Sequence, residues 1–421
     1  MAKKICIVGA GPKAMAIAAK ARVLRDLKIS DLTALIVEKS DLAANWDGRH
    51  GFTDGEQELG TPPEKDIGFP YESIFGKKVD ARLWDLSWPR YKVENGEYGN
   101  WVDKGRPQPR HGGWGRYLCW VCERAQPDII HGTVKEIRAV DGGVSFTVAE
   151  GSRERSVECS GIVLTGPGEA LKISDNFSDD SGLVLDGKTY WQNIPTFVGL
   201  AIGRIAVIGG GETAASVVLS LLRNTSSKVR VDLINRHGTI YTRGESYYEN
   251  RLFTYAGSWA DLDDDQKREF IQRTDRGVFS VAAKQEIDQS SRVHTIVGSV
   301  LGIGIEGGVV NVRALFRGSE YIWKYDRVIV ATGFDPFTGL GLISEDFRPT
   351  LPFSASVRQR LLRSIDSNLR IKISKDSEAE GSVINVHVPM LAGIAQGPGF
   401  PNLSCLGAVS DRVLGAYIAT P

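Results

Sequence analysis

The chain has 421 residues, of which 42% are apolar and 24% charged, and its 51 Lys and Arg balance its 51 Asp and Glu. This neutral, ordinary composition gives no sign of a nucleic acid or an anionic membrane as partner. No run of about 18 apolar residues argues for a transmembrane helix, and five sparse cysteines fit a reducing cytoplasm better than a disulfide framework.

The chain begins with a strand, a glycine turn, a helix and a second strand. Apolar runs at 5–8 and 34–37 enclose a turn at 9–13 and an alanine-rich helical stretch at 14–27. The first run is too short for a signal peptide, so we interpret it as a buried strand. This order predicts two parallel strands joined by a right-handed crossover.

The first turn has the spacing of a dinucleotide-binding site. Gly9 permits the tight turn, Gly11 lets backbone N–H groups approach a pyrophosphate, and Ala14 allows close packing of helix on strand. Glu38 ends the second strand, near the roughly 20-residue distance expected for an acid that binds ribose hydroxyls. The predicted FAD contacts of this unit are Gly9, Gly11, Pro12, Lys13 and Glu38.

The region that follows lacks clean periodicity. Residues 47–116 are rich in Gly, Pro and aromatic residues, which predicts long functional loops. A helix is expected at 117–124, and antiparallel strands are expected within 132–164. Cys119 and Cys122 form a C-x-x-C pair on that apolar helical stretch, so packing in a core is favoured over redox chemistry.

The same strand–turn–helix device restarts near residue 205. Strands at 205–208 and 229–234 enclose the turn at 209–211 and a helix at 212–222. The second strand ends in Arg236 rather than an acid, and a guanidinium can pair with a 2′-phosphate, so NADP(H) is favoured over NAD(H). The predicted NADPH contacts are Gly209, Gly211, Glu212, Thr213, Arg236, Ala331, Thr332 and Gly333.

These elements predict an α/β fold with two Rossmann-like dinucleotide-binding domains, one for FAD and one for NADPH, and a small substrate-binding segment. The predicted bounds are 1–199 for the FAD domain, 200–335 for the NADPH domain with an inserted substrate segment at about 243–281, and 336–421 for a return segment. Strand-end Thr-Gly turns at 165–166 and 332–333 are expected where the chain crosses between domains. A polar helix is expected at 257–276 and a last helix before residue 417.

The glycine turns alone leave several classes open. A disulfide reductase, an electron-transfer flavoprotein reductase and an inactive flavin-binding scaffold are all compatible with two dinucleotide sites. The six histidines show no metal-ligand spacing, so no metal site is expected.

Longer segments are more specific than the turns. They are VGAGPKAMAIAAKA, GTPPEKDIGFPY, VIGGGETAAS, RGESYYENRLF, RTDRGVFS, GPGFPNLSCLG and VSDRVLGA. On these segments the chain, over nearly its whole length, resembles the flavin-dependent N-hydroxylating monooxygenases, which hydroxylate the side-chain amine of lysine or ornithine for siderophore assembly. It is most similar to the branch that contains the lysine N6-hydroxylase of the mycobactin pathway.

The resemblance implies roles for individual residues. Lys65 matches a lysine that contacts the substrate carboxylate and the nicotinamide cofactor, and Asn250 matches an asparagine that binds the substrate backbone. Ser410 would lie near the substrate amine. The segment 38–46 would hold the FAD ribose and the flavin face. The implied flavin contacts are Trp46, Gly407, Ala408 and Val409.

Two positions depart from the ornithine hydroxylases. Asp275 falls where they carry an asparagine near the amine, and Gly60 falls where they carry a glutamine beside the flavin. Both departures favour the lysine branch. Asp275 is a candidate to bind the amine or to act as a base, or it lies away from the amine altogether.

The resemblance also implies the reaction. NADPH would reduce FAD, O₂ would add to give a C4a-hydroperoxyflavin, and the free amine would attack its distal oxygen. L-Lysine is the expected substrate, with L-ornithine or a diamine as the alternative. The expected enzyme is cytoplasmic and forms a homo-oligomer, a dimer or tetramer. A lysine ammonium has a pKa of about 10.4 and no lone pair, so the site must hold the amine neutral or remove its proton.

Overall fold

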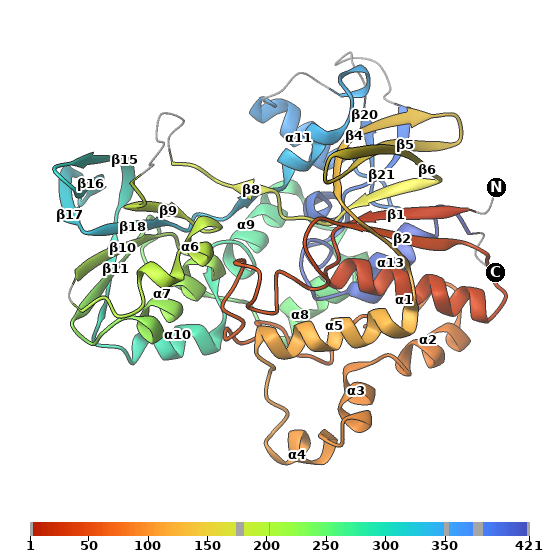
Figure 1. The fold of residues 1–421 in the computed structure, drawn as a ribbon, viewed down its shortest axis with the longest axis horizontal. Coiled ribbons are helices and arrows are strands. Elements are labelled where there is room, and N and C mark those ends of the chain that lie inside the picture. The colour runs from red at the N-terminus through yellow and green to blue at the C-terminus, as the bar shows by residue number, and fades with distance from the viewer. Residues whose placement is uncertain (1–2, 174–180, 202, 349–352, 374–381, 419–421) are drawn as a thin grey trace.

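The computed structural model describes residues 3–173, 181–201, 203–348, 353–373 and 382–418. Two parallel sheets lie at opposite ends of the molecule, one built from the N- and C-terminal parts of the chain and the other from its middle (Figure 1). The predicted α/β class with two Rossmann-like folds is confirmed. The residue bounds predicted for the domains stay predictions.

The first sheet has six strands in the order β20-β21-β7-β1-β2-β3. Their bounds are β20 Arg370–Ile373, β21 Ser382–His387, β7 Gly161–Leu164, β1 Lys4–Val8, β2 Thr33–Glu38 and β3 Asp128–His131. All neighbours are parallel except β20 and β21. The central strands are short apolar runs because both of their faces are covered.

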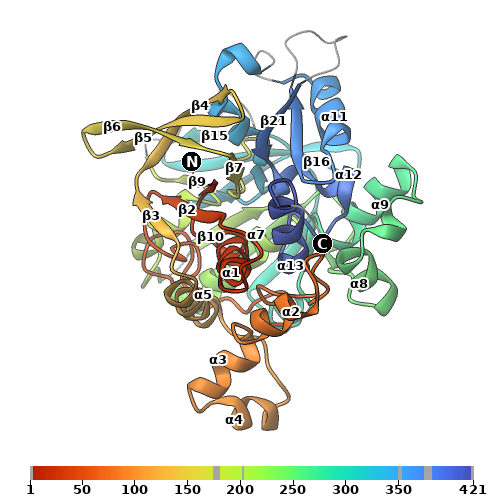
Figure 2. The same cartoon turned by 90° about the vertical axis from the view of Figure 1, so that its right-hand side faces the viewer.

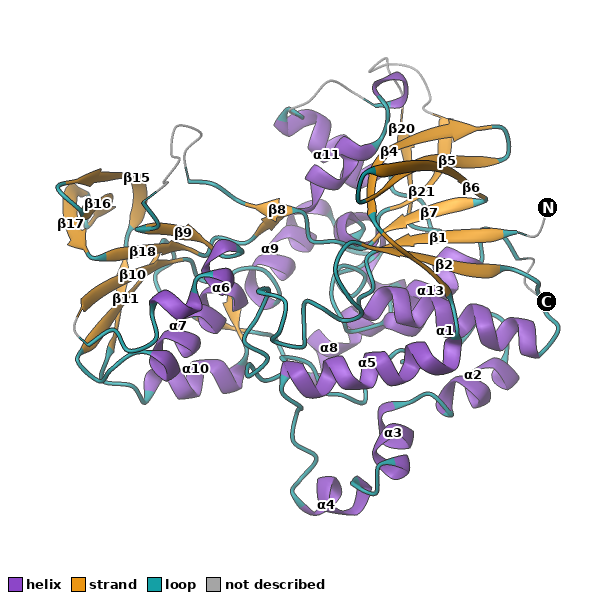
Figure 3. Ribbon diagram, in the orientation of Figure 1, coloured by secondary structure: helices purple, strands orange, loops and turns teal. Residues whose placement is uncertain are grey.

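Helices cover one face of this sheet and an antiparallel sheet covers the other (Figure 3). Helix α1 (Pro12–Asp26) packs against α5 (His111–Ala125) and α13 (Leu406–Leu414). The opposite face carries the hairpins β4 (Thr133–Val140), β5 (Gly143–Glu150) and β6 (Arg153–Cys159). The apolar side chains of these layers form one continuous core.

The second sheet repeats the same arrangement. Its five parallel strands have the order β14-β11-β10-β18-β9, with β14 Val293–Val297, β11 Val229–Asn235, β10 Gly203–Ile208, β18 Arg327–Val330 and β9 Val184–Asp186. Helices α7 (Glu212–Asn224) and α10 (Val281–Asp288) share a core with one face. The other face packs on the antiparallel strands β15 (Ser299–Glu306), β16 (Val309–Phe316) and β17 (Ser319–Tyr325).

Two small elements join the sheets. Strand β8 (Glu169–Ala170) leaves the first sheet and pairs antiparallel with β19 (Phe334–Asp335), which returns from the second. The inserted segment contains β12 (Tyr241–Thr242), α8 (Tyr247–Thr254), α9 (Asp264–Thr274) and β13 (Val278–Phe279). In Figure 1 α8 and α9 lie in the middle of the molecule, between the two large sheets, and Figure 2 shows that both project from one side.

The loop predicted over 47–116 is wrong in its second half. Residues there form α2 (Lys77–Trp84), α3 (Trp88–Glu94) and α4 (Tyr98–Asp103), and α5 begins at His111 rather than at residue 117. Buried Trp88 and Trp101 pack edge to face, so tertiary packing stabilises helices whose sequence lacks helical periodicity. The helix predicted at 257–276 is confined to α9, preceded by a 3₁₀ turn.

The remaining elements are short. They are α6 Thr189–Gln192, α11 Ala355–Ser364, α12 Gly393–Gln396 and the 3₁₀ helices Ile194–Thr196, Gly257–Trp259, Pro336–Leu342, Glu345–Phe347 and Pro389–Leu391. Among the described residues, no helix has both the length and the apolar composition needed to span a membrane.

Candidate functional site

The first glycine turn has the backbone that a dinucleotide site requires. Gly9 adopts φ 98°, and a Cβ there would lie 2.8 Å from Oγ1 of Thr165, so only glycine fits without strain. A Cβ built on Gly11 has no neighbour within 4 Å, so the turn is open on that side. The Thr165 hydroxyl donates to the carbonyl of Val8 at 2.7 Å and ties β7 to the end of β1.

Glu38 faces this turn from the end of β2. Its two carboxylate oxygens accept from the backbone N–H groups of Ala10 and Ser40, both at 2.8 Å. Each oxygen retains acceptor capacity, because an ionised carboxylate offers about four lone-pair positions. The carboxylate is therefore fixed at the carboxyl edge of the sheet, where it can accept from ribose hydroxyls.

Lys13 points away from the turn into the protein. Its ammonium donates to the carbonyls of Pro401 (2.9 Å) and Asn402 (3.2 Å). Burial lowers the pKa of this lysine to about 8. Lys13 thus ties the start of α1 to the loop before α13, a role that sequence reasoning had not assigned to it.

The implied flavin contacts lie around the same edge. Trp46 is partly buried and packs edge to face on His111, with 4.8 Å between the ring centroids. Gly407, in the first turn of α13, lies against the chain at 68–69: its N–H donates to the carbonyl of Phe69 at 2.8 Å. Ala408 is partly buried and Val409 is buried in the core.

Ser410 has no exposed surface. Its hydroxyl donates to the carbonyl of Gly407 at 2.8 Å within the same helix. A role beside the substrate amine stays a prediction for this residue.

The second turn is also tightly built. Gly209 has φ 154°, and a Cβ there would lie 2.3 Å from the carbonyl oxygen of Ala331. Gly211 lies against Gly277, with 3.5 Å from a built Cβ to its Cα. Arg236 follows β11 and is exposed. Thr332 is also exposed, and its hydroxyl donates to the carbonyl of Leu171, beside the β8–β19 link and Gly333.

Glu212, predicted as an NADPH contact, points toward protein groups. Its carboxylate accepts from the N–H of Ser280 at 2.7 Å and from Nε2 of Gln57 at 3.3 Å. Burial raises the pKa of this carboxyl. The methyl group of its neighbour Thr213 approaches Gly187. Glu212 therefore joins the second turn to the inserted segment and to the loop of the first unit.

Lys65 and Asn250, which are far apart in the sequence, are brought into contact. The Lys65 ammonium donates to Oδ1 of Asn250 at 2.7 Å, and the Asn250 amide donates to the carbonyl of Glu245 at 2.9 Å. A capping box between Ser246 and Glu249 fixes the start of α8, and so the position of Asn250. Burial, followed by the nearby Arg243 guanidinium, lowers the pKa of Lys65 to about 8.

Asp275 directly follows α9, and its side chain is 8% exposed. Its Oδ1 accepts from the side-chain amide of Asn402 at 3.1 Å, and Nε of Arg276 lies 3.4 Å from Oδ2. The Asn402 amide also donates to Pro398, and its oxygen accepts from the N–H of Ser404. The carboxylate is therefore held in one orientation by the loop before α13.

Two site contacts were not predicted from the sequence. Asn402 positions Asp275, and Arg243 donates to Oγ of Ser404 at 2.8 Å. Both contacts join residues more than a hundred positions apart. Arg243 and Asn402 lie in two of the family-like segments, RGESYYENRLF and GPGFPNLSCLG, but the resemblance gave neither residue a role.

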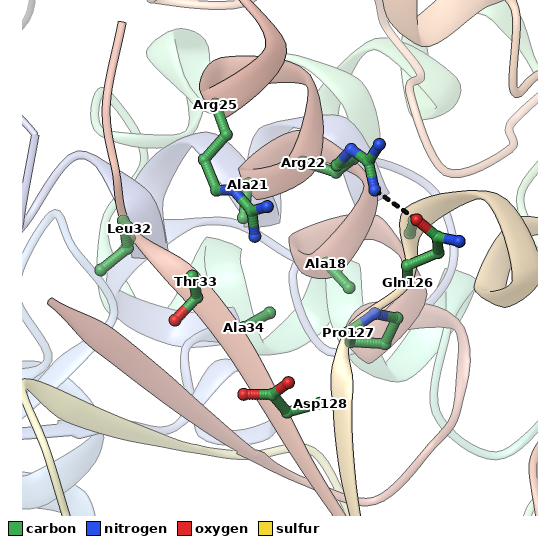
Figure 4. A pocket seen from close by; sticks show the side chains of 11 residues that line it. Ala18, Ala21, Arg22, Arg25, Leu32, Thr33, Ala34, Gln126, Pro127 and Asp128 are labelled. Carbon is green, nitrogen blue, oxygen red and sulfur yellow. Dashed lines mark hydrogen bonds between the residues drawn. The ribbon is translucent and has the colours of Figure 1, made fainter. Parts of the chain in front are cut away.

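A small cavity elsewhere is not this site. It has a volume of about 30 Å³ and lies between α1 and the amino ends of β2 and β3, beside the Arg22–Gln126 hydrogen bond of 2.7 Å (Figure 4). Such a volume holds about one water molecule. Ligands of open α/β sheets bind at the carboxyl ends of the strands, which is the opposite edge.

Comparison with known proteins gives consistent matches. A sequence model of the L-lysine 6-monooxygenase/L-ornithine 5-monooxygenase family matches residues 85–336. The L-lysine N6-monooxygenase MbtG of Mycobacterium tuberculosis is 37% identical over 428 residues, which cover 99% of this chain and 95% of that protein.

Solved structures give the same picture. The lysine monooxygenase NbtG of Nocardia farcinica is 34% identical, with a TM-score of 0.79 and coverage of 98% of this chain and 99% of that one. The ornithine N-hydroxylase KtzI of Kutzneria sp. 744, solved with reduced FAD, NADP⁺ and L-ornithine, has a TM-score of 0.76 at 17% identity, with 99% of each chain covered. At that identity the second likeness concerns the fold alone.

Proposed function

Because this chain belongs to the L-lysine 6-monooxygenase/L-ornithine 5-monooxygenase family, we propose that it hydroxylates the side-chain amine of L-lysine, with FAD, NADPH and O₂, for siderophore or related biosynthesis. The observation that carries the proposal is the contact of Lys65 with Asn250, on a half-buried edge between the two nucleotide-binding units. A cation and an amide placed together suit the carboxylate and the backbone amine of an amino acid.

The first turn fits FAD. Gly9 and Gly11 leave the turn open for a pyrophosphate at the N-terminus of α1, and Glu38 offers its carboxylate to the ribose. Trp46 and residues 407–409 would flank the flavin. When bound, FAD supplies the redox chemistry with NADPH and O₂ that no side chain provides.

The second turn fits NADPH. Arg236 is exposed at the end of β11, where its guanidinium would pair with a 2′-phosphate. Gly209 and Gly211 would accept the pyrophosphate at the N-terminus of α7. Glu212 would shape this site through Ser280 rather than bind the cofactor directly.

The chain's own task is to bind and orient the amine in the form that reacts. Lys65 would hold the substrate carboxylate, and Asn250 the backbone amine. Asp275, held by Asn402, would receive the ammonium and take up its proton, which leaves the amine with a free lone pair. Because an ion pair is stronger where water is excluded, Asp275 would bind the incoming ammonium firmly before the proton is transferred.

Finer properties follow as further proposals. L-Lysine is favoured over L-ornithine or a diamine because the curated relative with 37% identity is a lysine monooxygenase. We also propose a cytoplasmic homo-oligomer and a division of the chain at 199/200 and 335/336. Cys119 and Cys122 lie in α5, and burial raises the pKa of both thiols, which opposes a disulfide-reductase role.

One assay tests the proposal. The purified yellow protein is supplied with NADPH, O₂ and either L-lysine, L-ornithine or cadaverine, and both the hydroxylamine product and peroxide are measured. We expect the largest kcat/KM for hydroxylamine formation with L-lysine. Peroxide without hydroxylamine from all three amines would refute the hydroxylase function.

A further inference from the structure

A second cation lies beside Lys65, on the same face of α8. The guanidinium of Arg243 stacks over the ring of Phe253 at 5.1 Å, and the Lys65 ammonium contacts Asn250. Asn250 and Phe253 are three residues apart on α8, so they are neighbours on one helix face. The two cations therefore approach the same side of the helix from different parts of the chain.

Both cations are held in place by neutral groups. Nη2 of Arg243 donates to the hydroxyl of fully buried Ser404 at 2.8 Å, and Lys65 donates to the amide of Asn250. Within the described ranges, neither Lys65 nor Arg243 forms an ion pair within 4.0 Å. Glu212 lies near Arg243, but its carboxylate is already engaged by Ser280 and Gln57.

Glu245 lies near Lys65 and Glu212 near Arg243, but within the described residues neither carboxylate forms an ion pair with these cations, so the two half-buried cations form a site for an anion. Holding like charges together costs free energy that an anion between them recovers. A guanidinium matches a carboxylate in shape and can bind it with two hydrogen bonds, which an ammonium cannot do. Arg243 has five N–H donors, and the hydroxyl of Ser404 is its one side-chain hydrogen-bond acceptor among the described residues, so donors remain for a ligand.

We propose that Arg243 and Lys65 together bind the α-carboxylate of the substrate, and that Arg243 determines specificity for an amino acid over a diamine. This inference rests on the proposed function. Arg243 acts on binding and selectivity, because a carboxylate five bonds or more from the reacting amine takes no part in the chemistry. A diamine such as cadaverine, which lacks the carboxylate, would leave the two cations unneutralised.

The test compares two substrates that differ only in the carboxylate. For Arg243→Gln we expect KM for L-lysine to rise about 10- to 100-fold, as for loss of a charge-assisted hydrogen bond. We expect kcat/KM for cadaverine to change by less than about threefold, and KM for NADPH to stay as in the wild type. The matched control is Arg251→Gln, which removes an exposed α8 guanidinium that stacks on Tyr247 and Tyr255, and it should leave both substrates unaffected.

Two further measurements keep the inference testable. Flavin content and thermal unfolding identify a misfolded variant. Ser404→Ala retains the charge of Arg243 but frees its guanidinium, so it should raise KM for L-lysine less than Arg243→Gln does. Calorimetric titration with L-lysine measures binding without turnover. A double-mutant cycle of Arg243→Gln with Lys65→Gln should be non-additive if both cations hold one carboxylate.

The possible results distinguish failure of the proposed role of Arg243 from failure of the proposed hydroxylase function. If Arg243→Gln lowered kcat/KM equally for L-lysine and cadaverine, Arg243 would not bind the substrate carboxylate. The same would follow if the variant raised KM for NADPH but not KM for L-lysine. Either result would leave the hydroxylase function standing. Wild-type protein that binds L-lysine but makes no hydroxylamine would overturn the proposed function. Calorimetry on Arg243→Gln would then decide whether Arg243 binds the carboxylate of L-lysine. Wild-type protein that does not bind L-lysine would overturn both.

Discussion

Lys65 links the electrostatics of the site to the pH at which the enzyme works. Burial and Arg243 lower its pKa from 10.5 to about 8 in the free protein. The side chain is therefore charged below pH 8 and loses its proton as the pH rises through 8. Binding of a carboxylate requires the charged form, so affinity for the substrate falls on the alkaline side.

The first prediction concerns this alkaline limb. The ratio of kcat/KM of the wild type to that of Lys65→Arg should fall roughly tenfold between pH 8 and pH 9.5, because arginine stays charged throughout. Taking the ratio removes the rise caused by deprotonation of the substrate amine, which both enzymes share. The exposed Lys78→Arg serves as control and should give a flat ratio. A flat ratio for Lys65→Arg as well would show that this ammonium does not titrate in substrate capture.

Asp275 gives the second prediction. Asp275→Asn removes the negative charge that would receive the ammonium, so KM for L-lysine should rise about tenfold and the acid limb of kcat/KM should move to higher pH. Steady-state kinetics from pH 6 to pH 9 measure both effects. Asp265→Asn, on an exposed side chain of the same helix, provides the control. An unchanged KM and pH profile for Asp275→Asn would exclude it as a direct partner of the amine.

At the scale of elements, α13 depends on one glycine. Its first turn approaches the chain at 68–69 so closely that a Cβ on Gly407 would lie 2.2 Å from the carbonyl oxygen of Gly68. The same helix is anchored to α1 by the buried ion pair of Lys20 with Asp411, 2.5 Å long. The helix therefore cannot move away to accommodate a side chain without breaking that pair.

The third prediction is that Gly407→Ala destabilises the protein by about 1 to 3 kcal/mol and lowers its flavin content. Urea unfolding followed by tryptophan fluorescence gives the free energy, and absorbance of the purified protein gives the flavin per chain. Gly99→Ala, in exposed α4 with no atom within 4 Å of the added carbon, should be neutral or slightly stabilising. Equal stability of the two variants would contradict the close approach.

Some helices and strands could be predicted from the sequence, and others could not. The two strand–turn–helix units were predicted because buried parallel strands are apolar runs and glycine turns have fixed spacing. Strands β15–β17 were not predicted. Tyr321 and Ile322 are apolar but exposed on β17, so they obscure the alternation of buried apolar and exposed polar residues that marks a strand. Helices α3 and α4 were missed because their stability comes from tryptophans packed across elements.

The site shows the same division. The glycine turns and Glu38 follow from local spacing. Lys65 and Asn250 were expected at one substrate site only through the resemblance, since nothing local relates two residues on different units, and their direct contact was not predicted. Arg243 and Asn402 lie in family-like segments but were given no role, because their partners are set by how α8, α9 and the loop before α13 pack together.

At the scale of the whole molecule, side chains join the two units at several places outside the β8–β19 link. Arg223 of α7 donates to Asp54 of the first unit at 2.6 Å, with side chains 30% and 13% exposed. Gln57 reaches Glu212 from the same loop. Both contacts join the loop at 54–57 to α7, which follows the second glycine turn, so we expect them to help fix the distance between the two turns.

The last prediction tests that connection by reversing its charges. Arg223→Glu replaces attraction with repulsion toward Asp54 and should lower the free energy of unfolding by about 1 to 2 kcal/mol, while slowing reduction of the flavin by NADPH. Adding Asp54→Arg restores opposite charges with the order exchanged, and should recover at least half of both losses. Arg313→Glu reverses a charge within one unit, at an exposed pair with Glu320, and should cost less than about 0.5 kcal/mol without affecting reduction. If the double variant reduced its flavin as slowly and unfolded as easily as Arg223→Glu alone, the contact between Arg223 and Asp54 would not help to hold the two units together.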